Sequence, residues 1–201
     1  MPGRSKVSYI GRHLMIKGEY AEAILSGKKR ATIRLGVVKP RSREVIIHSG
    51  GRAICKAKIE GVIYKKFSEL TNEDARLDGF KNLKELRDAL LKTYQSFSPD
   101  DIITIIKFTV TQKFNKLNKQ SPYLGLNPVD LARIALRYDL LELSESDKEV
   151  LNIIVREGSL RKAAEKLYGD VNKRYLIRRV LRKALRKLIK HQVLDVKSLK
   201  K

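Results

Sequence analysis

The chain has 201 residues and a formal net charge of +22, from 44 lysines and arginines against 22 aspartates and glutamates. Its single cysteine, Cys55, excludes a disulfide framework within the chain and a cysteine-rich zinc site, and its three histidines lack metal-ligand spacing, so we expect no metal and no cofactor. No apolar run reaches membrane length and the amino terminus lacks a signal-peptide core, so we expect a cytoplasmic protein without a membrane partner.

The positive charge indicates a polyanionic partner. Nucleic acid is favoured over a membrane surface, because neither a lipidation motif nor a basic amphipathic anchor flanks the termini. The high charged fraction of 33%, with two methionines and no tryptophan, favours a thermophilic and archaeal source. The sequence leaves the oligomeric state open.

The first half of the chain predicts a small mixed β-barrel that carries a few helices. Residues 1–11 are expected to be a basic, flexible lead-in, and residues 12–113 to form the barrel domain. Alternating and β-rich patterns predict strands over residues 12–17, 31–35, 44–48, 52–64 and 102–110. Helical periodicity predicts helices over residues 18–26, 71–77 and 83–94, with a glycine cap at Gly27 and a basic loop over residues 37–43.

The second half predicts only helices after a polar linker over residues 114–127. Asn127 and Pro128 form a helix start, and Ser144 caps a helix that Gly158 ends. The helices are expected over residues 128–140, 144–156, 159–168 and 173–191, followed by a short strand over residues 193–196. Residues 128–201 are therefore expected to form a helical, basic domain, and the chain is α+β overall.

One octapeptide carries the strongest chemical signal. Gly27, Lys29, Thr32 and Arg34 form the pattern G-x-K-x-x-T-x-R at a helix-to-strand corner. Two cations and a hydroxyl at a helix end can hold a phosphate or a polarised carbonyl. In a chain this basic, the expected anion is nucleic acid.

This motif, in its order along the chain, resembles the ASCH domain, the activating-signal-cointegrator homology family, which is related in fold to PUA domains. The resemblance covers residues 12–110 and is carried by the following residues: Tyr20, Ile24, Gly27, Lys29, Thr32, Arg34, Asp78, Gly79 and Phe80. It implies a PUA-like β-barrel of five or six strands, with a cleft at the octapeptide that binds RNA.

The resemblance also implies two possible functions for the cleft, catalysis and binding. Some bacterial members of the family look catalytic: one hydrolyses the acetyl amide of N4-acetylcytidine and another cleaves RNA. By that likeness the catalytic residues would be Lys29, Thr32 and Asp78, with an aspartate in place of the family's glutamate. Without catalysis, the corner would bind nucleic acid through Lys28, Lys29, Arg30, Thr32 and Arg34.

The last predicted helix is strongly basic. Apolar pairs recur every four residues between Lys173 and Lys190, no acidic residue falls between them, and basic residues fill the gaps. Because like charges repel on every turn, this face indicates an anionic partner. The expected nucleic-acid contacts are Arg178, Arg179, Arg182, Lys183, Arg186, Lys187 and Lys190.

Residues 158–167 resemble the second helix of helix-turn-helix regulators, with Ala163 and Ala164 at a close helix crossing and the candidate strand as a wing.

Three functions follow from the sequence. The leading one is binding of structured RNA, either tRNA or rRNA. The alternatives are a hydrolase that acts on acetylated cytidine or on RNA, and a DNA-binding transcriptional regulator whose barrel is a sensor.

Overall fold

The computed structural model describes residues 7–94, 98–115 and 120–194. The chain divides into two compact units, Met1–Lys113 (unit 1) and Phe114–Lys201 (unit 2). Unit 1 combines a mixed sheet with short helices, and unit 2 is helical. Among the described residues, no helix is long and apolar enough to cross a membrane.

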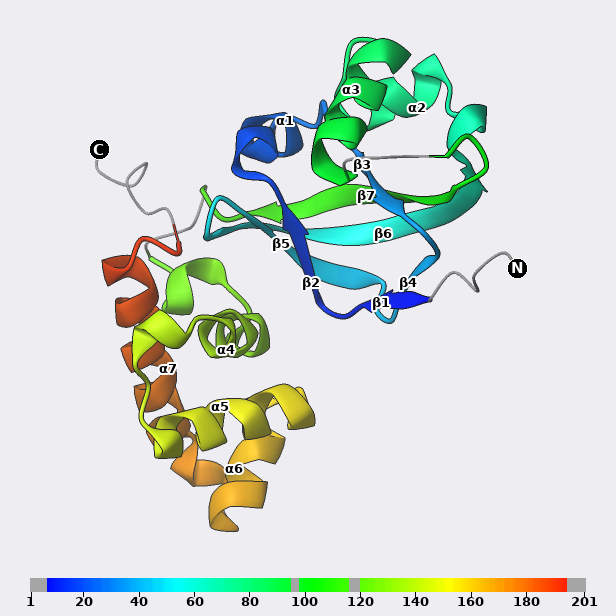
Figure 1. The fold of residues 1–201 in the computed structure, drawn as a ribbon. Helices are drawn as coiled ribbons and strands as arrows, with labels where there is room; N and C mark the ends of the chain where they lie inside the picture. The colour runs from blue at the N-terminus through cyan, green and yellow to red at the C-terminus, as the bar shows by residue number, and fades with distance from the viewer. Residues whose placement is uncertain (1–6, 95–97, 116–119, 195–201) are drawn as a thin grey trace. The chain divides into compact units, whose positions relative to one another are not determined.

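The core of unit 1 is a curled five-stranded sheet (Figure 1). Its strands, in spatial order, are β2 (His13–Ile16), β5 (Glu44–Ser49), β6 (Arg52–Lys66), β7 (Ile102–Lys113) and β3 (Ala31–Leu35). β2 and β5 are parallel, and the other neighbours are antiparallel. Two register shifts along the long strand β6 mark bulges, which bend a strand and increase its twist. The strands predicted from alternation are all present.

A second, two-stranded ribbon was not predicted. Strand β1 (Ser8–Ile10) pairs in parallel with β4 (Val38–Pro40). The first of these segments was expected in the flexible lead-in, and the second in the basic loop 37–43. Each strand has three residues, too few for an alternating pattern, and their pairing joins segments that lie far apart in the sequence. Residues 1–6 lie outside the described part of the chain.

The helices of unit 1 lie on one side of the sheet, and the β1–β4 ribbon lies on the other (Figure 1). The helix expected over residues 18–26 is a 3₁₀ turn, η1 (Gly18–Tyr20), that continues into α1 (Ala21–Leu25). The turn η2 (Phe67–Glu69), α2 (Asn72–Leu77) and α3 (Leu83–Tyr94) follow β6. In α2, Thr71 and Asp74 form a reciprocal capping box.

Two hydrophobic clusters hold this unit together. The first joins α1 to β2, β5, β6 and β7 around Ile24, Ile47 and Phe108. The second joins α2 and α3 to β3 and β7 around Leu86 and Ile105. The strand β3 therefore lies beneath the helices, and the segment between α1 and β3 leads from the first cluster, at Ile24, to the second, at Ala31.

The described residues of unit 2 form four α-helices, at the places where the sequence predicts helices, and three short 3₁₀ turns before or between them. They are α4 (Pro128–Arg137), α5 (Glu145–Glu157), α6 (Leu160–Tyr168) and α7 (Arg174–Lys190), with turns η3 (Pro122–Gly125), η4 (Asp139–Leu141) and η5 (Val171–Lys173). Asn127, Ser144 and Ser159 cap their helices through side-chain oxygens. Gly158 ends α5 in the left-handed conformation.

The segment predicted as a linker is packed at both ends, and the described part of the predicted wing is not a strand. β7 extends to Lys113, and Phe114 and Leu126 are buried, so both ends of segment 114–127 are packed; residues 116–119 lie outside the described residues. Val193 and Leu194 are buried but not in a strand, and the rest of the predicted strand 193–196 also lies outside the described residues.

Candidate functional site

The octapeptide forms a tight corner between α1 and β3. Gly27 takes a φ of +81°, which favours glycine, and its N–H donates to the Ile24 carbonyl. The next backbone groups are bonded to three different elements: Lys29 N–H donates to Ala23 of α1, and Arg30 N–H donates to Leu77 of α2. The Arg30 carbonyl accepts from Phe108 of β7. The corner is therefore fixed before any ligand arrives.

Gly79 lies directly against this corner. It has a φ of +89°, and a Cβ atom added to it would lie 3.1 Å from the Cβ of Lys29 and 3.5 Å from its Cα. Two separate requirements therefore favour glycine here, a positive φ and a close approach to Lys29.

Gly79→Ala is expected to destabilise unit 1 by about 2–3 kcal/mol, because backbone strain and a crowded contact add. Gly27→Ala is the matched control, since Gly27 also has a positive φ but open space around an added Cβ. We expect the control to cost about 1 kcal/mol from strain alone. Thermal unfolding followed by circular dichroism measures both, and equal losses would contradict a role for the contact.

Lys29 and Asp78 form a buried ion pair. Lys29 Nζ lies 2.5 Å from Asp78 Oδ1 and donates a second hydrogen bond of 2.8 Å to the Asp78 carbonyl. The two residues are 2% and 5% exposed. The ammonium also lies 4.7 Å from the ring centre of Tyr20 and 5.9 Å from that of Phe80, whose rings meet edge to face.

Burial changes the proton affinities of this pair. Desolvation lowers the pKa of Lys29, with a smaller contribution from the Arg34 charge, while Asp78 opposes the shift. Desolvation raises the pKa of Asp78 to about 6, against the effects of Lys29, Arg34 and the Ile33 N–H, which hydrogen-bonds to the carboxyl group. Both shifts favour the neutral forms, so a proton moves between these groups more easily than in water.

Thr32 and Arg34 line the same pocket as the ion pair. Alternate residues of β3 point to one face of the sheet, which places both side chains beside Lys29 and Asp78. The Arg34 guanidinium donates to the Met15 carbonyl of β2 and so bridges the two edge strands of the sheet. The pocket of about 60 Å³ has room for a few water molecules.

The structure thus brings together four of the predicted residues, Lys29, Thr32, Arg34 and Asp78. Lys28 and Arg30 are exposed beside the corner and do not line the pocket. Sequence reasoning missed the contribution of β2 and α3: Lys17 Nζ donates to Thr93 Oγ1 over 2.8 Å, and both line the pocket together with Tyr94. No local pattern could indicate these residues, because only the packing of α3 over the end of β2 brings them to the site.

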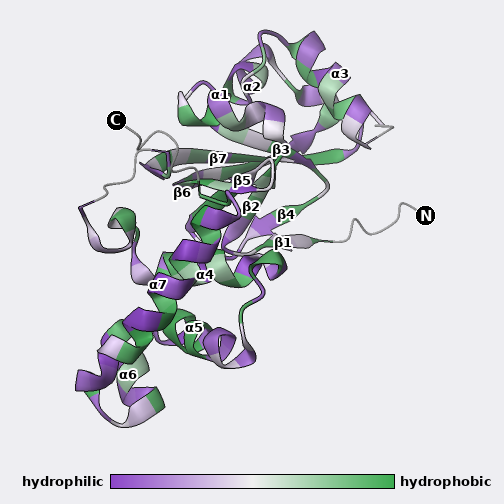
Figure 2. Cartoon of the chain, turned by 90° about the vertical axis from the view of Figure 1, so that its left-hand side faces the viewer, coloured by the Kyte–Doolittle hydropathy of each residue, from purple (hydrophilic) through white to green (hydrophobic). Residues whose placement is uncertain are grey.

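The basic helix α7 has one packed face and one exposed face. Ile177, Leu181, Ala184 and Leu188 are fully buried. Hydrophilic and hydrophobic residues alternate along α7 in Figure 2. The exposed face presents five of the predicted cations: Arg178, Arg179, Arg182, Arg186 and Lys190.

Two other cations that were predicted to contact nucleic acid instead bind groups within unit 2. Lys183 Nζ donates to Asp147 Oδ2 of α5 over 2.5 Å. Lys187 Nζ donates to the carbonyls of Leu141 and Glu142, over 2.5 and 2.8 Å. These lysines hold α7 to the preceding helices. The repulsion expected along α7 is therefore relieved at two positions.

Residues 6–112 match the model of the ASCH domain family. The chain belongs to the ASCH domain family. This confirms the resemblance drawn from the octapeptide, and it gives unit 1 its fold: a curled, PUA-like half-barrel, followed in this chain by helices. The ASCH family is associated with RNA binding.

Solved structures show similar folds over about half of this ASCH chain. An ASCH domain from Lactobacillus crispatus is 20% identical, with a TM-score of 0.45, over 52% of this chain and 80% of that one. Protein EF3133 from Enterococcus faecalis is 18% identical, with a TM-score of 0.40, over 48% of this chain and 69% of that one. A mutant of the ZmASCH protein from Zymomonas mobilis is 18% identical, with a TM-score of 0.37, over 51% of this chain and 70% of that one. No curated protein matches the chain significantly.

Proposed function

We propose that this protein binds structured RNA, either tRNA or rRNA. The observation that carries the proposal is the exposed face of α7, where five cations stand on a helix with no acidic residue between Arg174 and Lys190. Such a face suits the phosphates of a nucleic-acid backbone. The family's association with RNA favours RNA over DNA.

In this proposal the pocket of unit 1 has a different role from α7. Lys29 is held by Asp78, so its ammonium is not available as a simple phosphate clamp. A pocket of about 60 Å³ is too small to enclose a nucleotide. An unpaired nucleotide would instead rest at the rim, where Lys28, Arg30 and Arg34 supply positive charge, while the buried pair sets the polarity beneath it.

The test is the affinity of the intact protein for a fluorescent tRNA transcript and for duplex DNA of similar length, measured by anisotropy from 50 to 300 mM KCl. The proposal predicts tighter binding to the RNA, with an affinity that falls steeply as salt rises. A preference for the duplex DNA would overturn it, and would favour the regulator with helix-turn-helix-like helices α5 to α7.

A second candidate function is hydrolysis of N4-acetylcytidine or of RNA. Lys29, Thr32 and Asp78 line one pocket, and the pKa shifts of the ion pair favour proton transfer. In the amide reaction, Thr32 Oγ1 would attack the acetyl carbonyl as neutral Lys29 takes its proton. Asp78 would pass a proton to the leaving amine, and water would then release acetate and restore the hydroxyl.

For this candidate we expect Thr32→Val to lower turnover of N4-acetylcytidine at least about 100-fold, because it removes the nucleophile and keeps the side-chain shape. Thr32→Ser keeps a hydroxyl and should retain part of the activity. Acetate release and shortening of labelled RNA are measured in parallel. If the unaltered protein performs neither reaction, the hydrolase candidate is wrong, and the proposal of RNA binding is unaffected.

A further inference from the structure

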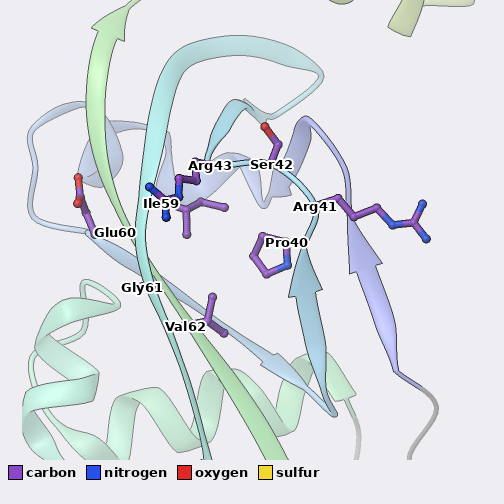
Figure 3. A pocket seen from close by; sticks show the side chains of 8 residues that line it. All are labelled: Pro40, Arg41, Ser42, Arg43, Ile59, Glu60, Gly61 and Val62. Carbon is purple, nitrogen blue, oxygen red and sulfur yellow. The ribbon is translucent and has the colours of Figure 1, made fainter.

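A groove of about 290 Å³ lies on unit 1 (Figure 3). It is formed by the segment that leaves β4 and by the middle of β6, and it shares no lining residue with the Lys29 pocket. Its lining consists of Pro40, Arg41, Ser42, Arg43, Ile59, Glu60, Gly61 and Val62. Part of this segment was predicted from the sequence as a basic loop, without a function.

The segment on one side of the groove is held in place by its backbone. Arg41 N–H donates to the Ile10 carbonyl over 2.8 Å, and the Arg43 carbonyl accepts from Ile59 N–H over 2.7 Å. The Ser42 hydroxyl donates to the Glu44 carbonyl over 2.8 Å. These bonds anchor the basic segment to β1 at one end and to β6 at the other, so a ligand would meet a preorganised surface.

The floor of the groove is apolar and open. Pro40 and Val62 point toward each other in Figure 3, and Ile59 lies on the adjoining part of β6. β6 shifts register between Ile59 and Gly61, and a Cβ atom added to Gly61 would meet nothing within 4 Å. The bulge bends β6 beside this floor.

The rim of the groove is cationic and carries an aromatic ring. Arg41 and Arg43 are exposed, and the Arg41 guanidinium lies 4.4 Å from the ring centre of Tyr9. Tyr9 is itself 55% exposed, on the neighbouring strand β1. A guanidinium stacked on a ring is held with its N–H donors directed outward, which suits recognition of phosphate oxygens.

Nearby acidic groups do not cancel this charge. Glu44 pairs with Lys56 over 3.1 Å, and Glu60 lies 3.7 Å from Lys58. Within the part of the chain that the structure describes, neither Arg41 nor Arg43 has a carboxylate partner. The rim therefore offers two guanidiniums to an anion.

We propose that this groove binds a single-stranded segment of nucleic acid. A base would lie against Pro40, Ile59 and Val62, while Arg41 and Arg43 contact the phosphates on either side. Apolar contact with a base tolerates any sequence, and the guanidiniums add the salt-dependent part of the affinity. The inference rests on the proposed function and extends it to a second contact surface, on unit 1.

The test uses Val62→Asp, which puts a carboxylate on the apolar floor of the groove, where the Val62 side chain points toward Pro40. We expect it to weaken binding of a fluorescent 12-nucleotide RNA to the intact protein about tenfold, the loss expected for one displaced base. Val7→Asp is the matched control, since Val7 is an exposed valine of unit 1 that does not line the groove, and the substitution makes the same change of charge. It should bind as the unaltered protein does.

A second variant, Arg41→Gln with Arg43→Gln, keeps the proposal testable if Val62→Asp unfolds. It should lower the slope of log affinity against log salt by about 1.4, for two phosphate contacts on a single strand. If neither variant changes the affinity or the salt slope, the proposal that the groove binds nucleic acid is wrong, while the proposal of RNA binding through α7 is unaffected. An unaltered protein that binds no RNA would overturn both proposals. The same 12-mer as DNA shows whether the groove distinguishes the two sugars.

Discussion

Lys29→Met is expected to destabilise unit 1 by about 3–5 kcal/mol at pH 8. The substitution keeps the length of the side chain but leaves the Asp78 carboxylate buried without its cation, and breaking a buried ion pair by removing one partner has a cost of this size. Hydrogen exchange of the β3 and β7 amides measures the loss within unit 1, since the two units of the chain need not unfold together.

The loss depends on pH in a definite direction. The pKa of Asp78 in the folded protein, about 6, lies above its ordinary value, so the folded state binds the extra proton and stability falls as pH rises through this range. Because Lys29 lowers the pKa of Asp78, removing Lys29 raises this pKa further. The pH range over which stability falls then extends to higher pH. We therefore expect the variant to be closer in stability to the unaltered protein at pH 5 than at pH 8.

The control for this experiment is the double variant Lys29→Met with Asp78→Asn. It removes both charges and keeps an acceptor for the Ile33 N–H. We expect it to recover most of the stability that the single variant loses, because a neutral pair has no buried charge to compensate. A double variant as unstable as the single one would show that Lys29 acts through packing alone.

Arg182→Glu with Arg186→Glu is expected to weaken tRNA binding about 100-fold or more. A hydrogen bond to a charged group contributes about 1.5–3 kcal/mol, and two are lost. The slope of log affinity against log salt should fall by about 2, because two phosphate contacts disappear. Both side chains are exposed, and the new glutamates lie four residues from Arg178 and Lys190, so α7 itself should remain folded.

The matched control is Lys162→Glu with Lys166→Glu on α6. It changes the net charge by the same amount, with the same four-residue spacing, at two exposed positions of unit 2. We expect a small loss of affinity and an unchanged slope. Equal effects of the two pairs would mean that net charge alone attracts RNA, and would contradict a specific role for the α7 face.

Local patterns predicted much of this fold because its elements have strong local signals. The caps at Asn127 and Ser144, and the glycines at 27 and 158, lie where the sequence places them. The octapeptide and the later Asp78 were likewise expected to share a cleft, through family resemblance. Lys29, Thr32 and Arg34 of the octapeptide line one pocket with Asp78.

What the sequence could not predict depends on contacts between distant segments. The β1–β4 ribbon joins two three-residue strands, and Lys17 meets Thr93 across 76 positions. His13 Nδ1 and His48 Nε2 lie 2.9 Å apart only because β2 and β5 pair in parallel. Lys183 and Lys187 look like the other cations of α7, yet their partners belong to α5 and to the segment before it. Charge patterning cannot separate a structural lysine from one that is free to bind RNA.

The most direct test of RNA binding is ultraviolet crosslinking of the protein to nucleic acid in its own cells, followed by stringent purification and sequencing of what is attached. The account predicts enriched tRNA or rRNA at defined positions, with crosslinked peptides that include residues of α7. Enriched genomic DNA, with RNA at background, would contradict it.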